Sequence, residues 1–170
     1  RRVAWDLGSN TGAFSKLLAA HAGFVVAVDS DHESVERLYR SVRQDGQRNI
    51  LPLVADLTNL SPDQGWNGSE RIAFDKRNKP DLVICLAVIH HMRLSANIPI
   101  AMFLDWLGSL GAQIVIEFVD RDDEMVQTIL RRKQQAHPEY CIEAFDQALK
   151  ARFVVLGHEE LKGGCRKLYF

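Results

Sequence analysis

The chain has 170 residues, of which 46% are apolar and 25% are charged, and its net charge at pH 7 is −1. This length predicts one domain, and a domain of about 150 residues buries roughly 70% of its unfolded surface, so its core needs no disulfide or metal. The apolar content excludes a disordered chain, and the balanced charge excludes a strongly basic nucleic-acid clamp or an acidic tail. Nucleic acid is therefore not an expected partner.

The three cysteines, Cys85, Cys141 and Cys165, are far apart and odd in number. They form neither a paired metal motif nor a disulfide framework, which favours a reducing, cytoplasmic setting. No apolar run approaches the roughly 20 residues that span a membrane, so no membrane association is expected. The chain opens on Arg1 and Arg2 and enters an apolar run at once. We interpret residues 1–170 as one domain. We expect it to be a fragment of a longer chain, without that chain's N-terminal segment. The sequence does not predict the oligomeric state.

Strand-like apolar runs alternate with segments of helical period along the chain. Strands are predicted at Val3–Leu7, Phe24–Val28, Ile50–Val54, Asp81–Ala87, Gln113–Val119, Phe153–Leu156 and Cys165–Phe170. Helices are predicted at Ala13–His21, Val35–Val42, Ile100–Leu107, Met125–Lys133 and Ile142–Leu149. The segment Leu60–Lys79 is polar and rich in turn residues, so we expect a loop with at most one short helix there.

This alternation predicts an α/β fold of three layers, with helices on both faces of a doubly wound, mostly parallel sheet of seven strands. Between the last two strands no long helix fits, which indicates an antiparallel C-terminal hairpin at the sheet edge. In such a sheet, ligands bind beyond the carboxyl ends of the strands. The residues that directly follow each parallel strand therefore carry the functional prediction.

The loop after the first strand reads Asp6-Leu7-Gly8-Ser9-Asn10-Thr11-Gly12. Its glycines permit a tight turn and a close approach to a ligand, and the start of the next helix favours a negatively charged group. The spacing of Gly8 and Gly12 is not the G-x-G-x-x-G of dinucleotide sites, and the P-loop lysine is missing. The carboxylate of Asp6 would repel a pyrophosphate and indicates a ligand that is cationic at this point. The alternative is that both glycines only shape a turn.

Acidic residues also follow the second and third strands. A carboxylate at Asp29 could accept hydrogen bonds from both hydroxyls of a ribose, and Asp56 could accept one from an exocyclic amine beside the apolar Leu57. The alternatives are a helix N-cap for Asp29, although Asp31 suits that role better, and a turn-forming role for Asp56. The three loops together predict an adenosine with a cationic, amino-acid-like tail.

These residues resemble the motifs of the class I S-adenosylmethionine (AdoMet)-dependent methyltransferases over nearly the whole chain. Through Trp5–Gly12 and Ile116–Phe118 the sequence is also similar to a bacterial subgroup of nodulation-type methyltransferases. The resemblance implies the strand order 3-2-1-4-5-7-6 and AdoMet as cofactor. It also implies a set of cofactor-binding residues: Asp6, Gly8, Ser9, Asn10, Gly12, Asp29, Ser30, Asp56, Leu57 and Leu86.

Methyl transfer is an in-line displacement that depends mainly on positioning, and it needs a general base only when the acceptor must lose a proton. The chain lacks the Asn/Asp-Pro-Pro-aromatic motif, the Pro-Cys pair and the terminal acid of the metal-dependent enzymes, so no metal is expected. His90 and His91, after the fourth strand, and Glu117, in the fifth, are the predicted catalytic residues. The alternatives are a cap or packing role for the histidines and a salt bridge for Glu117.

The sequence thus predicts an AdoMet-dependent methyltransferase that acts on oxygen or nitrogen of a small or conjugated metabolite. One alternative is an AdoMet-binding module, regulatory or structural, without catalysis. A nicotinamide-dependent oxidoreductase is disfavoured by the glycine spacing.

Overall fold

The computed structural model describes residues 2–133, 137–161 and 163–170. Its strands are β1 (Val3–Leu7), β2 (Phe24–Asp29), β3 (Ile50–Val54), β4 (Leu82–Cys85), β5 (Gln113–Val119), β6 (His158–Glu160) and β7 (Arg166–Tyr169). They form one seven-stranded sheet in the order β3-β2-β1-β4-β5-β7-β6. Strands β1, β2 and β3 pair in parallel, whereas β7 pairs antiparallel with both β5 and β6. The predicted fold class and strand order are confirmed.

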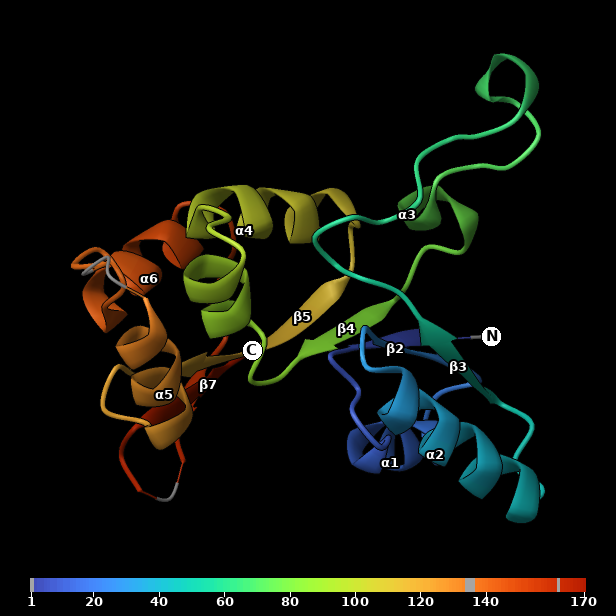
Figure 1. Cartoon of the computed structure of the whole chain (residues 1–170), viewed down its shortest axis with the longest axis horizontal. Coiled ribbons are helices and arrows are strands. Elements are labelled where there is room, and N and C mark those ends of the chain that lie inside the picture. Colours follow the sequence, from blue (N-terminus) through green and yellow to red (C-terminus); the bar gives the residue numbers. More distant parts are fainter. Residues whose placement is uncertain (1, 134–136, 162) are drawn as a thin grey trace. The chain divides into compact units, whose positions relative to one another are not determined.

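The α-helices are α1 (Ala13–Ala19), α2 (His32–Gln44), α3 (Phe74–Arg77), α4 (Ile100–Ser109), α5 (Glu124–Arg132) and α6 (Ile142–Lys150). Two further turns are the 3-10 helix η1 (Trp66–Gly68) and the π-helix η2 (His91–Ser95). The chain forms two compact units, one of Arg1–Ile84 with Leu110–Ala112 and the other of Cys85–Ser109 with Gln113–Phe170. Each unit contains both strands and helices (Figure 1).

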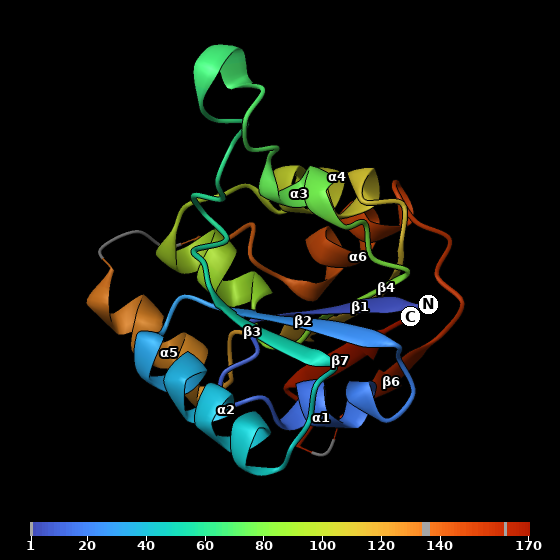
Figure 2. The same cartoon turned by 90° about the vertical axis from the view of Figure 1, so that its right-hand side faces the viewer.

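In the first unit, α1 and α2 cover one face of β1–β3, and α3 lies over the other face (Figures 1 and 2). The side chains of Val35, Leu38 and Val42 recur at helical spacing in α2 and are buried. Leu38 and Val42 belong to one apolar cluster with residues of β1, β2 and β3. Burying apolar area of this kind contributes about 25 cal/mol per Å², which makes this stripe the main reason for the helix to form. Because β1, β2 and β3 pair in parallel, their carboxyl ends lie at the same edge of the sheet.

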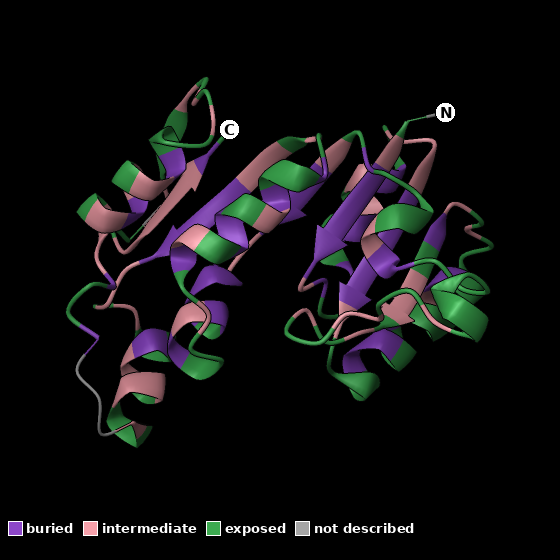
Figure 3. Cartoon of the chain, turned by 90° about the horizontal axis from the view of Figure 1, so that it is seen from above, coloured by how far each residue is buried: buried purple, intermediate pink, exposed green. Residues whose placement is uncertain are grey.

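In the second unit, α4 and α6 pack side by side on one face of β5 and β7, and α5 lies on the other face (Figures 1 and 2). The core on this side is aromatic: the ring of Phe118 lies 5.1 Å from that of Tyr140 and 4.9 Å from that of Phe145. Figure 3 shows the deepest burial along the central strands β1, β2 and β4 and the C-terminal half of β5, whereas β6 is exposed.

Two predictions of local structure are wrong. The segment Phe153–Leu156 is not a strand, because Val154 and Leu156 are 86% and 77% exposed and pairing with β7 places the strand at β6 instead. The segment Leu60–Lys79 holds two short helical turns, η1 and α3, where at most one was expected. The second turn forms because Phe74 packs its ring 4.9 Å from that of the buried Trp5.

Candidate functional site

The loop after β1 is built on left-handed backbone. Gly8, Asn10 and Gly12 have φ values of 75°, 48° and 82°. A side chain at Gly12 would also clash, since its Cβ would lie 2.2 Å from Cδ1 of Leu38, a core residue of α2. The glycine at this point is therefore required both by the backbone conformation and by the packing of the loop on α2.

The amides of this loop are bound by the chain itself. The N–H groups of Gly8 and Ser9 donate to the carbonyl of Val28 at 2.8 and 2.9 Å, and that of Gly12 donates to the carbonyl of Ser9. The amides of Asn10 and Thr11 donate to carboxylate and amide oxygens. A phosphate-binding loop points such amides at its ligand. This loop is instead a preformed elbow, so the expected preference for an anion rests on the N-terminus of α1, which has no side-chain cap.

Asp29 holds the elbow to the end of β2. Its Oδ2 accepts from the amide of Asn10 at 2.7 Å, and its Oδ1 accepts from the amide of Asp31 at 2.9 Å. A carboxylate offers about four acceptor positions, so each oxygen keeps one for a ligand. The alternative role for Asp29 is wrong, because the N-cap of α2 is Asp31, which accepts from the amide of Glu33.

Asp6 lies beneath the elbow with only 3% of its surface exposed. It accepts a hydrogen bond from Oγ of Ser15 at 2.5 Å. Burial raises its pKa to about 6; the bond from Ser15 opposes this shift, and the charge of Asp29 adds to it. Oγ of Ser9 is also buried, without a hydrogen-bond partner in the described chain. The carboxyl ends of β1 and β2 thus present carboxylates and an unsatisfied hydroxyl, a set that suits a ligand rich in donors or positive charge.

Of the predicted residues after β3, Asp56 forms hydrogen bonds within its own turn. Oδ1 of the exposed Asp56 accepts from the amide and the hydroxyl of Thr58 at 2.8 and 2.7 Å. This is the turn-forming arrangement named as its alternative, although further acceptor positions remain. Leu57 is half-buried, and Ser30 is exposed.

The second unit holds the remaining predicted residues. Leu86 follows β4 and is half-buried. His90 is buried, and its ring lies 4.2 Å from that of the exposed His91, which begins η2. Burial, followed by the neighbouring His91, lowers the pKa of His90 to about 3, so its imidazole is neutral near pH 7. Nδ1 of His90 is buried and without a hydrogen-bond partner among the described residues.

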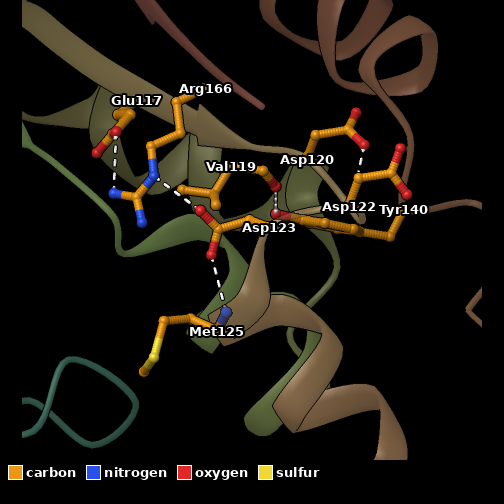
Figure 4. Close-up of polar contacts among 8 residues, drawn as sticks. All are labelled: Glu117, Val119, Asp120, Asp122, Asp123, Met125, Tyr140 and Arg166. Atoms are coloured by element: carbon orange, nitrogen blue, oxygen red, sulfur yellow. Dashed lines mark hydrogen bonds and ion pairs between the residues drawn. The ribbon is translucent and has the colours of Figure 1, made fainter. Parts of the chain in front are cut away.

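Glu117 forms a salt bridge within this unit (Figure 4). The guanidinium of Arg166 lies between the buried carboxylate of Glu117, 3.4 Å from its Oε1, and the half-buried carboxylate of Asp123, 2.9 Å from its Oδ2. The sequence prediction missed Arg166 and Asp123. A signal was available for Asp123, which is the N-cap of α5 in the segment that follows β5. No local pattern in the sequence pairs Glu117 or Asp123 with Arg166, which lies more than 40 positions away.

Among residues 2–133, 137–161 and 163–170, no cluster of three or more His, Cys, Asp or Glu side chains is placed to hold a metal ion. No helix in the described part of the chain is both long and apolar enough to cross a membrane.

The chain is similar to the nodulation protein NoeA of Rhizobium meliloti (strain 1021), with 35% identity over 170 residues. The match covers 99% of this chain but only 35% of NoeA, so the chain spans about a third of the length of this relative. No protein-family model matches the sequence.

Solved structures share the fold at low sequence identity. A SAM-dependent methyltransferase from Aquifex aeolicus has a TM-score of 0.63 and 18% identity, and the match covers 99% of this chain and 80% of that one. The N-methyltransferase NodS from Bradyrhizobium japonicum WM9, in complex with S-adenosyl-L-homocysteine, has a TM-score of 0.66 and 13% identity over 99% of this chain and 76% of its own. The chain therefore has the fold of the SAM-dependent methyltransferases and is similar, along nearly its whole length, to part of NoeA.

Proposed function

We propose that this chain binds AdoMet at the carboxyl ends of β1–β3 and transfers its methyl group to oxygen or nitrogen of a small or conjugated metabolite. The observation that carries the proposal is the position of Asp29. Its carboxylate faces the elbow through the amide of Asn10 and keeps one acceptor position on each oxygen. Two adjacent acceptors of this kind match the two hydroxyls of a ribose.

The residues of the first unit fit the methyl donor in charge as well as in hydrogen bonding. AdoMet carries an ammonium group and a sulfonium, and the loop offers the carboxylate of Asp6 while its amides are bound internally. A cationic group beside Asp6 would offset the burial that raises the pKa of this carboxyl. A dinucleotide would bring a pyrophosphate to the same point, where carboxylates repel it and no loop amide is free to bind it.

On the acceptor side, the proposal keeps His90, His91 and Glu117 as groups of the second unit that orient the metabolite. The neutral imidazole of His90 could form a hydrogen bond with a polar acceptor but is a weak proton acceptor, because its pKa is low. Glu117 contributes a carboxylate that Arg166 fixes in place. When bound, AdoMet supplies the electrophilic methyl, and these residues supply orientation.

Isothermal titration tests the donor half of the proposal. AdoMet and S-adenosylhomocysteine are expected to bind, whereas NAD is not. Asp29→Asn should weaken AdoMet binding about tenfold or more, because charge-assisted hydrogen bonds contribute about 1.5–3 kcal/mol. The matched control is Asp31→Asn, which keeps the cap of α2, since asparagine caps as well as aspartate.

A second titration isolates the sugar. The 2′-deoxy analogue of S-adenosylhomocysteine should bind the native chain more weakly than the parent compound, and this difference should shrink in Asp29→Asn. An equal difference in both proteins would place the ribose elsewhere. Transfer of a labelled methyl group to a metabolite extract separates the enzyme from a binding module without catalysis.

A further inference from the structure

His137, which the sequence prediction did not single out, is fixed to the carboxyl end of β5. Its carbonyl accepts from the guanidinium of Arg121 at 3.1 Å and from the amide of Tyr140 at 3.0 Å. The hydroxyl of Tyr140 in turn donates to the carbonyl of Val119, the last residue of β5, at 2.5 Å (Figure 4). Ligands of open α/β sheets bind beyond such strand ends. His137 therefore lies in a part of the second unit where an acceptor is expected.

The imidazole of His137 is buried and oriented by a carboxylate. Only 6% of its side chain is exposed, and its Nδ1 lies 3.2 Å from Oε1 of Glu139. A carboxylate accepts but does not donate, so in the neutral imidazole this contact places the hydrogen on Nδ1 and leaves the lone pair on Nε2. Nε2 is buried and has no hydrogen-bond partner among the described residues.

Glu139 is itself fixed from the segment that follows β4. It is paired with the guanidinium of Arg93 in η2, whose side chain is only 18% exposed. A carboxylate that orients an imidazole whose second nitrogen is unoccupied is the arrangement of a general base. Here Arg93 of η2 fixes the carboxylate of Glu139. The bond from Tyr140 to Val119 fixes the segment that carries the imidazole of His137 at the carboxyl end of β5.

We infer that His137 is the general base of the proposed methyl transfer, that Glu139 is its positioning residue, and that the acceptor is a hydroxyl group. The inference rests on the proposed function, with AdoMet as methyl-donor substrate. Nε2 of His137 takes the proton of the hydroxyl as its oxygen forms a bond to the methyl carbon. The carbon–sulfur bond breaks with its electron pair on sulfur, which becomes a neutral thioether. The imidazolium then gives its proton to water.

The chemistry of the acceptor follows from the presence of a base. A hydroxyl is a poor nucleophile until it loses its proton, whereas a neutral amine or a carboxylate attacks without one. Two of the three predicted catalytic residues are poorly suited to accept a proton near neutral pH, because the pKa of His90 is lowered and Glu117 is bound to Arg166. The third, His91, is exposed. His137 combines burial with an orienting carboxylate.

The first test measures transfer of a tritiated methyl group from AdoMet into the small-molecule fraction of a cell extract, at saturating AdoMet. His137→Asn should lower the rate about a hundredfold or more while AdoMet affinity, measured by titration, stays unchanged. The rise of the native rate with pH should disappear in the same variant. The matched control is His158→Asn, an exposed histidine of β6, which should keep the native rate and pH profile. The labelled product should be a methyl ether.

Two further measurements separate a base from a structural residue. In His137→Ala, added imidazole should restore part of the rate, because it can occupy the vacated space and accept the proton. In the native protein, nitrogen NMR should show His137 with hydrogen on Nδ1 and a free lone pair on Nε2. Glu139→Ala should lose this fixed tautomer, whereas the exposed control Glu143→Ala should keep it.

The outcomes distinguish the inference from the function on which it rests. If AdoMet does not bind the native chain, the proposed function fails, and the inference fails with it. If AdoMet binds and the label is transferred, but His137→Asn keeps its rate and pH profile, only the inference is overturned. A methylamine or methyl ester as product also overturns it, as does the opposite tautomer of His137.

Discussion

The two units differ in the groups that bind the carboxylates at and near the ends of their strands. In the first unit, Asp29 and Asp56 accept hydrogen bonds from nearby amides and a hydroxyl, and no salt bridge to either appears in the described chain. In the second, Glu117 and Asp123 share the guanidinium of Arg166 (Figure 4). Amide donors orient a carboxylate without adding a positive charge, whereas the guanidinium of Arg166 offsets one of the two negative charges that share it. The first arrangement keeps negative charge available for a cationic ligand, and the second stabilises the fold.

The largest expected effect concerns the elbow that gives the first unit its arrangement. Gly12→Ala should lower the free energy of unfolding by about 3 kcal/mol, because left-handed backbone costs roughly 1–2 kcal/mol and forcing a methyl against Leu38 costs roughly 1–3 kcal/mol. Chemical denaturation measures the loss. Gly46→Ala is the matched control, since Gly46 also has positive φ but has no atom within 4 Å of the added Cβ. Equal losses in both variants would mean that the contact with Leu38 is easily relieved.

The uncompensated charge of the first unit predicts a dependence on pH. The pKa of Asp6 is raised to about 6 in the folded state, so between about pH 4 and pH 6 the folded chain binds more protons than the unfolded chain. Stability from this group therefore falls as pH rises through that window, by roughly 2–3 kcal/mol. Asp6→Asn should abolish this part of the pH dependence in thermal unfolding and also weaken AdoMet binding at pH 8. A variant that lost stability at pH 8 would contradict the assignment.

The two carboxylates of the second unit that share Arg166 predict the opposite trend. Arg166→Met should cost about 2 kcal/mol at pH 7, because two mostly buried carboxylates lose their cation while the partly exposed arginine contributes less than a fully buried one. Burial raises the pKa of Asp123, but the bonds from Arg166 and from the amide of Met125 together outweigh burial and lower it. Stability from the pair with Arg166 is therefore lost as pH falls through the carboxyl range. The deficit of the variant should therefore shrink toward pH 4. Arg40→Met, which breaks an exposed pair with Glu36, should change stability by less than about 0.5 kcal/mol.

The smallest expected effect is at the end of β5. Tyr140→Phe removes the hydrogen bond to the carbonyl of Val119 and leaves this buried acceptor with one partner fewer, a cost of about 1 kcal/mol. Tyr39→Phe is the control, because Tyr39 is exposed and its hydroxyl only accepts from Arg43. If the two variants lose equal stability, the bond does not hold the turn that carries His137.

The sequence by itself determined the alternation of strands and helices, the glycine elbow and the acids at the carboxyl ends of β1, β2 and β3. These features are local: a buried strand needs a continuous apolar run, and left-handed backbone favours glycine or asparagine. The sequence favoured Asp31 over Asp29 as the cap of α2, and the tertiary structure decided that Asp31 caps the helix while Asp29 faces the elbow. The tertiary structure alone brought Arg166 to Glu117 and Asp123, and Glu139 to Arg93. Such pairs join residues more than 40 positions apart, and their distances are set by how strands and helices pack, which no local pattern records.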